Sequence, residues 1–559
     1  MIRLSRRSLI GVSAVAPIAV LAALVPGNAA VASGGHHAVS RDAHGVFHGR
    51  PVLTPLGRAK PAAAAPNLAA GKPSPWQPLK HAPPFIPGSM LLASDGRVLV
   101  HVEPPAGGTS RWYKLTPDSK GSYANGTWSK LPSMPSNYNP LYFASAILPD
   151  GRMIVEGGEY LGGTPTWTSK GAIYNPVTNT WRSVAPPDGW ANIGDASSEV
   201  LANGTFMLSQ ACQDCTSPNG VLSTADALFN ATGLNWTNLA GQGKNDPNDE
   251  EGWSLLPSGQ ILTVDTWLTP TTEVFTPSPS LIWSFAGNTV TSPINSPEVE
   301  TGPQVVMPGG NTFVVGAGTS SDIPPKPCTT RRTAPTALYN YAAGRWARGP
   351  AIPTIGGLQY DSADGPASIL PDGNVLFDVS PCVFQTPLAF FLYNAGSRTL
   401  SPVPNIPNAA NDSTFYTRML ALPNGQILFN DGSQHMLVYT AGGTPNPAWA
   451  PSITGISSFS FTPGQSGNLS GTQLAGLSQG AAYGDDVQSN TNFPLVRITN
   501  RQSGAVTYAR TSNWTSVSIA PGAASSTKFT IPTGTPAGPS TLVVVANGIA
   551  SQPVPVTIR

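Results

Sequence analysis

Acidic residues are grouped in a chain that carries few charges. Only 11% of the 559 residues are charged, and the formal net charge is +1. Carboxylates nevertheless precede four successive apolar runs, at Asp195, Asp249–Glu251, Glu298 with Glu300, and Asp361 with Asp364. Carboxylate oxygens are hard ligands suited to Ca²⁺, and they also accept hydrogen bonds from sugar hydroxyls.

If the fold brings these residues to a common rim, Asp195, Glu250, Glu300 and Asp364 would bind a calcium ion or a glycan. Trp253 would then offer a face on which a sugar could stack. Two other interpretations stay open. Acidic residues at strand starts also make local turn hydrogen bonds and remain solvated. A carboxylate pair could also hydrolyse a glycosidic bond, which requires a defined separation between the two groups.

The elements that would position these residues come from a phrase repeated seven times. Each copy is an alternating apolar run, an Asp-Gly-like turn and a second apolar run, as in Ala144 to Gly158 (ASAILPDGRMIVEGG). The turn glycines are Gly96, Gly151, Gly204, Gly259, Gly310, Gly373 and Gly425. A hairpin that recurs about every 50 to 60 residues is typical of the blades of a β-propeller. The sequence therefore predicts seven blades, whose inner strands all start at one end of a central channel.

A weaker second hairpin follows in each period, as in Ala172 to Trp181 (AIYNPVTNTW). It predicts the outer strands, with tryptophans packed between neighbouring blades. After Pro451 the repeat stops, and short strands at another spacing predict an immunoglobulin-like sandwich. The expected fold is all-β: a seven-bladed β-propeller at 76–450 followed by an immunoglobulin-like β-sandwich at 451–559.

The N-terminal residues 1–32 predict a signal peptide. Arg6 and Arg7 precede an apolar run, and a small-x-small cleavage site follows at Ala30 to Ala32. The paired arginines favour twin-arginine export. Residues 33–75 are rich in Ala, Pro and Gly and predict a disordered spacer. We expect a secreted or periplasmic monomer with no transmembrane segment in the mature chain.

The cysteines predict disulfide bonds, and the net charge argues against a nucleic-acid partner. Four cysteines in an exported chain predict two disulfides. Cys212 and Cys215 would close a tight local loop, and Cys328 and Cys382 lie about one blade period apart. A chain with a net charge of +1 lacks the basic face that nucleic-acid binding needs, so we expect no nucleic-acid partner.

A propeller followed by a sandwich, with the C-terminal phrases LAGLSQGAAYGDD (474–486) and VVVANGIAS (543–551), resembles the exported kelch-type proteins of the galactose oxidase and glyoxal oxidase superfamily. The C-terminal phrases look like its early-set domain. The resemblance implies a copper ion on the propeller axis, held by two tyrosines and two histidines, with one tyrosine bonded to a cysteine. It places those tyrosines at Tyr142 and Tyr416, and the aromatic residue that shields the cross-link at Tyr160.

The remaining copper-site positions depart from the family pattern. Thr417 stands where one histidine is expected, Trp514 where the other is expected, and Ile86 where the cysteine is expected. Copper(II) prefers nitrogen and oxygen ligands in a tetragonal arrangement, and both imidazoles are missing. We therefore expect no copper, and His81, His101 and His435 should be surface or packing residues.

These observations favour one function over two others. The expected function is an exported, copper-free propeller that binds an extracellular glycan or another surface ligand at its axial mouth. No cofactor is expected beyond calcium at the acidic rim. The alternatives are an oxidase of alcohols or aldehydes with a rearranged metal site, and a structural or adhesive surface module without a small ligand.

Overall fold

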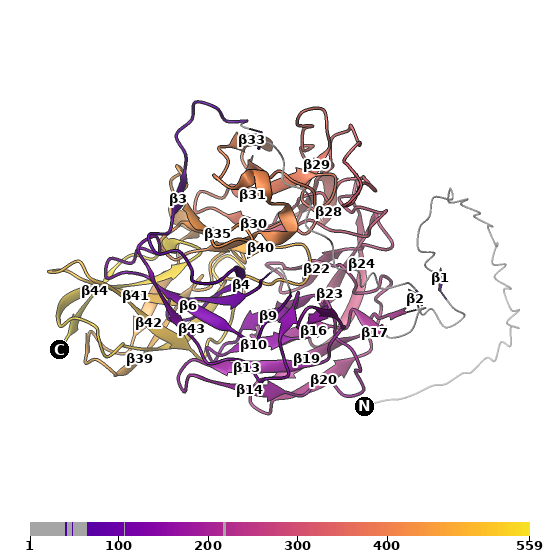
Figure 1. Ribbon diagram of the computed structural model, residues 1–559. Helices are drawn as coiled ribbons and strands as arrows, with labels where there is room; N and C mark the ends of the chain where they lie inside the picture. Colours follow the sequence, from indigo (N-terminus) through magenta and orange to yellow (C-terminus); the bar gives the residue numbers. More distant parts are fainter. Residues whose placement is uncertain (1–39, 42–46, 49–63, 67, 105–106, 216–219) are drawn as a thin grey trace, which may run out of the picture. The chain divides into compact units, whose positions relative to one another are not determined.

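The computed structural model describes residues 40–41, 47–48, 64–66, 68–104, 107–215 and 220–559. The predicted signal peptide lies outside these residues. The described chain is almost entirely β (Figure 1), with short 3-10 helices at η1 (Ala409–Asn411), η2 (Thr414–Tyr416) and η3 (Pro447–Trp449). Among the residues that the structure describes, no helix is long and apolar enough to cross a membrane.

Antiparallel sheets of four strands form the blades, in sequence order. The first is β4 (Pro87–Leu92), β5 (Val98–Val102), β6 (Trp112–Thr116) and β7 (Thr127–Lys130). The second is β9 (Ala144–Ile147), β10 (Met153–Glu156), β13 (Gly171–Asn175) and β14 (Thr180–Val184). The third is β15 (Ser198–Val200), β16 (Phe206–Ser209), β19 (Asp226–Asn230) and β20 (Asn235–Leu239). The fourth is β21 (Trp253–Leu255), β22 (Ile261–Val264), β23 (Thr271–Thr276) and β24 (Ile282–Asn288).

The later blades follow the same plan. The fifth is β25 (Gln304–Val306), β26 (Thr312–Val314), β27 (Ala337–Asn340) and β28 (Arg345–Arg348). The sixth is β30 (Ala367–Ile369), β31 (Val375–Pro381), β32 (Ala389–Asn394) and β33 (Thr399–Val403). The seventh is β34 (Arg418–Ala421), β35 (Ile427–Asn430) and β36 (Met436–Tyr439), completed by β3 (Trp76–Pro78) from the start of the propeller.

The inner strands form a closed ring. Each of β4, β9, β15, β21, β25, β30 and β34 contacts the next, and β34 contacts β4. All seven turn glycines have positive φ, from +74° at Gly96 to +88° at Gly310, a conformation that glycine adopts without steric cost. The seven-bladed prediction is confirmed.

Tryptophans on the outer strands join neighbouring blades, as predicted. The Trp181 indole N–H donates to Pro132 O (2.9 Å), and that of Trp236 donates to Ala185 O (2.8 Å). Each acceptor belongs to the segment that leads out of the preceding blade. Buried indole N–H groups need such partners, and the rings fill the space between sheets.

The C-terminal domain is a curled β-sandwich. Its strands pair in the order β37 (Ser452–Ile456), β39 (Ser466–Thr472), β43 (Ala524–Thr530), β42 (Val506–Ser512), β41 (Leu495–Asn500), β44 (Gly538–Ala546), β46 (Val554–Ile558) and β38 (Ser460–Phe461), with β45 (Ile549–Ala550) beside β44. Strand β42 pairs with β41 through its first half and with β43 through its second half. It therefore passes from one layer to the other, around a core that includes Phe461, Leu469 and Phe529.

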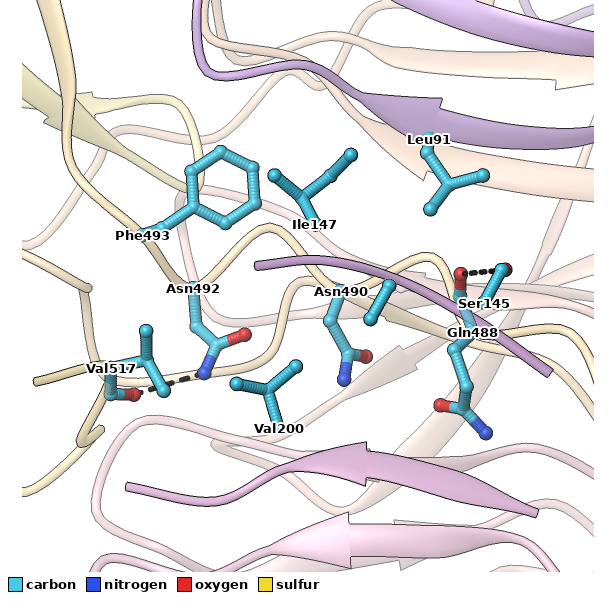
Figure 2. Close-up of a pocket in the computed structure, with 10 residues that line it drawn as sticks. Leu91, Ser145, Ile147, Val200, Gln488, Asn490, Asn492, Phe493 and Val517 are labelled. Carbon is cyan, nitrogen blue, oxygen red and sulfur yellow. Dashed lines mark hydrogen bonds between the residues drawn. The ribbon is translucent and has the colours of Figure 1, made fainter. Parts of the chain in front are cut away.

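Residues 474–494, which we call the channel insert, leave this sandwich and enter the ring of inner strands. Strand β40 (Ala481–Ala482) within it pairs with β30, and it also contacts β25 and β34. Figure 2 shows Gln488 to Phe493 beside Leu91, Ser145 and Val200 of the first three blades. The cavity between them holds about 10 Å³, enough for one water molecule. The insert therefore fills the channel.

The segment expected to be a disordered spacer is partly structured. Strands β1 (Ser40–Arg41) and β2 (Phe47–His48) extend the hairpin of β17 (Cys212–Asp214) and β18 (Val221–Leu222). The edge of that hairpin offers unpaired backbone groups, which a further strand can satisfy. Closer to the propeller, Ala69 is buried, and Asn405 donates to Pro66 O (2.6 Å).

The predicted Cys328–Cys382 disulfide is present. Cys328 and Cys382 join the segment before the outer strands of the fifth blade to the end of β31, with Cα atoms 5.4 Å apart. Cys212 begins β17 and Cys215 directly follows that strand, with Cα atoms 5.9 Å apart; their bond stays a prediction.

Replacing both Cys328 and Cys382 by Ser should lower the free energy of unfolding by about 2 to 4 kcal/mol, because that bond closes a long loop in the unfolded chain. The matched control is the Cys212→Ser and Cys215→Ser pair, whose sequence separation is 3 instead of 54. By loop-closure entropy it should cost about 2 kcal/mol less. Urea unfolding monitored by tryptophan fluorescence measures both. Equal losses of free energy of unfolding in the two double variants would contradict the explanation by loop length.

Glu199 should make stability depend on pH. Burial raises its pKa to about 8, although the Val200 N–H and the side chains of Gln479 and Asn490 donate hydrogen bonds that lower it. An unfolded Glu ionises near about 4.3, so the folded state keeps a proton that the unfolded state loses as pH rises. Glu199→Gln should therefore remove a decline of about 1.4 kcal/mol per pH unit between about pH 5 and 7.5. If the free energy of unfolding of wild type and of Glu199→Gln fell in parallel as pH rises, Glu199 would not be the source of the pH dependence.

Candidate metal centre at the axial mouth

The predicted acidic residues do gather at one end of the ring, which we call the mouth, where the inner strands begin. Asp195, Glu250, Glu300 and Asp364 stand just before β15, β21, β25 and β30. In a closed ring of equivalent blades, these positions face a common axis. The structure divides the four residues between two clusters.

The first cluster, the mouth triad, consists of Glu250, Glu300 and Asp364. Each offers one carboxylate oxygen, and these atoms lie within 4.8 Å of one another. The three residues are half-buried. Carboxylates at this separation repel one another when ionised, and a common cation could bind between them.

The second cluster, the buried triad, consists of Asp195, Asp485 and Asp486. Its three ligand oxygens also lie within 4.8 Å of one another. The side chains are 8%, 3% and 2% exposed, respectively. Asp485 and Asp486 belong to the channel insert, so this cluster joins the two domains.

The mouth is electrostatically unfavourable without a cation. Burial, followed by repulsion from Asp485 and Glu300, raises the pKa of Glu250 well above its usual value. Burial and the carboxylates of Asp364 and Asp485 do the same for Glu300. A bound cation would remove the repulsion that holds these groups protonated.

Several carboxylate oxygens at the mouth have no hydrogen-bond partner. They are Asp195 Oδ1, Glu300 Oε2, Asp364 Oδ1, Asp485 Oδ2 and Asp486 Oδ2. Leaving a buried polar atom unsatisfied costs about 1 to 3 kcal/mol, and more for a charged group. Two of these atoms belong to the mouth triad and three to the buried triad.

Three residues at the mouth have strained backbone conformations. Tyr142, Glu250 and Asp364 have φ of +51°, +58° and +44°, the left-handed region that non-glycine residues rarely adopt. Such strain persists where the surrounding structure enforces it, and it is common at functional sites.

The structure brings together the tyrosines that the resemblance implies. The rings of Tyr142 and Tyr160 lie 5.9 Å apart, nearly perpendicular. A small sheet of β8 (Pro140–Leu141), β11 (Tyr160–Leu161) and β12 (Thr164–Pro165) positions them. Burial raises the pKa of Tyr142, the nearby Arg418 lowers it, and Tyr416 raises it further.

The donor atoms at the mouth do not fit the family's copper ion. His101 is buried, and its ring nitrogens already contact Glu103 Oε1 (2.9 Å) and Thr109 O (2.6 Å). His81 contacts Gly126 O, and His435 contacts Ser433. No imidazole with a described side chain joins either triad. The expectation that these histidines are packing or surface residues is met.

The positions implied for the copper histidines serve other purposes. Thr417 donates to Asp378 Oδ2 (2.7 Å). Trp514 stacks on Phe493 with ring centroids 4.6 Å apart. The channel insert of the C-terminal domain brings Asp485 and Asp486 beside Asp195, whereas Trp514 packs on Phe493.

Trp253 does not face the mouth, which corrects its expected role as a sugar-stacking surface. It is 4% exposed and packs on Trp283 at 5.5 Å, between the third and fourth blades. Its indole N–H donates to Glu251 Oε2 (3.3 Å). Trp253 is the first residue of an inner strand, where both faces are buried, so its side chain turns into the core.

Sequence reasoning missed Glu159, Asp485, Asp486 and Arg418. Glu159 follows Gly157-Gly158 and is half-buried, and its pKa is raised by burial and by repulsion from Asp485 and Asp364. Asp485 and Asp486 end the phrase LAGLSQGAAYGDD, whose length without strand alternation is the available signal of an irregular excursion. Arg418, directly after Thr417, is a buried cation that attracts Asp364 and Asp486.

Comparisons with known proteins give fold neighbours only. No protein-family model and no curated protein matches the chain. Among solved structures, a copper-bound fungal alcohol oxidase of the AA5 family is 14% identical with a TM-score of 0.47, over 87% of this chain and 99% of that one. YjhT is 13% identical with a TM-score of 0.37, over 58% and 99%. The extracellular domain of BT4673, a two-component system protein from B. thetaiotaomicron, is 9% identical with a TM-score of 0.42, over 93% and 62%.

Trp253→Ala should lower the free energy of unfolding by about 3 to 5 kcal/mol, because it opens a cavity between two blades. It should leave cation binding at the mouth unchanged, since the indole does not line the triad. Calorimetric unfolding and Ca²⁺ titration of the variant measure the two effects separately. If Trp253→Ala weakened cation binding without lowering the free energy of unfolding, the conclusion that Trp253 lies away from the mouth would be wrong.

Proposed function

We propose that this protein is an exported propeller that binds a hard divalent cation, Ca²⁺, at the mouth triad and, through that cation, the hydroxyl groups of an extracellular glycan. The observation that supports the proposal most directly is the convergence of three carboxylates from neighbouring blades, two of which keep an oxygen without a partner.

The choice of calcium follows from the donor set. Ca²⁺ accepts six to eight oxygen ligands at about 2.3 to 2.6 Å in flexible geometry. Glu250, Glu300 and Asp364 supply up to two oxygens each and remain half-exposed. Positions on the cation therefore stay open for oxygens from outside, and paired sugar hydroxyls are suitable ligands. Copper, by contrast, favours nitrogen ligands that these residues lack.

Tyr142 is the aromatic contact for the sugar in this proposal, in place of Trp253. It is half-buried at the mouth, beside Tyr160. Burial raises its pKa, so the phenol stays neutral and can both stack and donate a hydrogen bond.

Location outside the cytoplasm is part of the proposal. The leader predicts export, and the Cys328–Cys382 disulfide is consistent with an oxidising compartment. Cations at millimolar concentration are available there, which suits a site that is half-open and of modest affinity.

The retained tyrosines favour one rival, an oxidase of alcohols or aldehydes. It would require copper to bind oxygen ligands at Tyr142, Tyr416 and the nearby carboxylates without any imidazole. A structural or adhesive module is the other rival, and it predicts a mouth that is indifferent to cations.

Calorimetric titration of chelator-treated protein tests the proposal. Wild-type protein should bind Ca²⁺, and Glu300→Gln should weaken binding at the mouth at least about tenfold, because a direct ligand loses its charge. Asp188→Asn, which removes an exposed carboxylate elsewhere, is the matched control and should change nothing. A glycan array read with Ca²⁺ and with chelator should lose its signals on chelation.

Three results would contradict the proposal. The first is a heat of Ca²⁺ binding that Glu300→Gln leaves intact, together with unchanged glycan signals. The second is stoichiometric tight copper binding, which would favour the oxidase. The third is the absence of any cation effect on glycan binding, which would favour the adhesive module.

A further inference from the structure

The buried triad has a different character from the mouth triad. All three of its residues are more than nine-tenths buried, and each keeps one carboxylate oxygen without a hydrogen-bond partner. Without a ligand, the chain would bury three acidic groups with unmet acceptors at one point.

Nearby side chains do not supply the missing charge. Arg418 is the cation that attracts Asp485 and Asp486, but its guanidinium lies 4.0 Å over the Tyr483 ring. One of its terminal nitrogens donates to Phe415 O and Thr417 O. Among the described residues, it makes no hydrogen bond or ion pair with a triad oxygen, and its Nε has no partner.

A third acidic cluster, in the fourth blade, differs from the buried triad because a lysine neutralises it. Asp246, Glu251 and Asp265 also place their oxygens within 4.8 Å of one another. There, however, Lys244 Nζ lies 2.7 Å from Glu251 and 2.7 Å from Glu273. Asp246 also accepts backbone hydrogen bonds from Thr266, Trp267 and Leu268. This cluster contains its own cation, and the buried triad does not.

The position of the buried triad indicates what a cation would do there. Asp195 belongs to the third blade, whereas Asp485 and Asp486 belong to the insert. Between Asp485 and the mouth triad runs Gly484, where a side chain would meet Asp364 Oδ1 at 2.7 Å. The close approach of the insert to the sixth blade therefore depends on the absence of a Cβ at Gly484, directly before Asp485 and Asp486.

We propose that Asp195, Asp485 and Asp486 form a second cation site, in which Ca²⁺ fastens the channel insert to the third blade. This site is separate from the proposed function, because it is closed to an external ligand and its role is to hold the two domains together. A cation that binds only the docked insert stabilises docking by mass action.

Hydrogen–deuterium exchange of the full chain, with Ca²⁺ or chelator as the probe, tests the proposal. Amides of residues 474–494 that exchange by release of the insert should slow about 100-fold when free Ca²⁺ is 100 times its Kd at this site. The same protection should appear in Glu300→Gln, which removes the charge of one ligand of the mouth triad and leaves the buried triad unchanged. Asp195→Asn should abolish it while leaving the mouth titration in place.

Metal analysis after gel filtration in Ca²⁺ gives the second readout. Wild-type protein should hold more calcium per chain than Glu300→Gln, and Glu300→Gln should still hold calcium. If Asp195→Asn fails to fold, the comparison of wild type with Glu300→Gln still decides. Insert exchange that ignores Ca²⁺ in both proteins overturns the second site. Loss of insert protection in Glu300→Gln also overturns it, and leaves the mouth triad as the sole binding site.

Discussion

The pairing of β3 with β36 closes the ring, and the position of every acidic residue at the mouth depends on that closure. Trp76, Gln77 and Pro78 pair with Tyr439, Val438 and Leu437, so the start of the propeller completes its last blade. The Trp76 ring then packs within 5.3 Å of Phe390 and Phe429. An open ring could relieve charge repulsion by spreading its blades. In a closed ring the repulsion at the axis must be balanced chemically.

The channel insert adds residues of the C-terminal domain to the acidic residues that the closed ring holds at its axis. A propeller channel would otherwise be lined by inner-strand polar groups and water. Here β40 pairs with β30, Gln479 accepts from the Leu255 N–H, and Tyr483 donates to Phe415 O. The backbone and side chains of the insert thus satisfy groups of several blades. The same docking adds Asp485 and Asp486 to an axis that already carries acidic residues, so the packing that stabilises the insert also increases the charge to be balanced.

Much of this arrangement could be predicted from the sequence, because a blade is a local unit. The turn glycines, the outer tryptophans and the Cys328–Cys382 bond follow from the repeat, and so does the convergence of Glu250, Glu300 and Asp364. The remainder depends on contacts between distant segments. No periodicity indicates that residues 474–494 enter the channel. The side on which Trp253 lies was also not predictable, because an inner strand is buried on both faces and shows no alternation.

The contrast between Lys244 and the mouth explains why function is expected at one acidic cluster rather than another. In the fourth blade the neutralising charge is part of the chain, is fully buried, and bonds to Glu251 and Glu273. A lysine held in this way has no contacts left to offer a ligand. In the proposed function the corresponding charge at the mouth triad comes from solution, and a calcium ion has more ligand positions than three carboxylates fill. The proposal therefore places binding at Glu250, Glu300 and Asp364, which are half-buried and which form no ion pair with a lysine or arginine among the described residues.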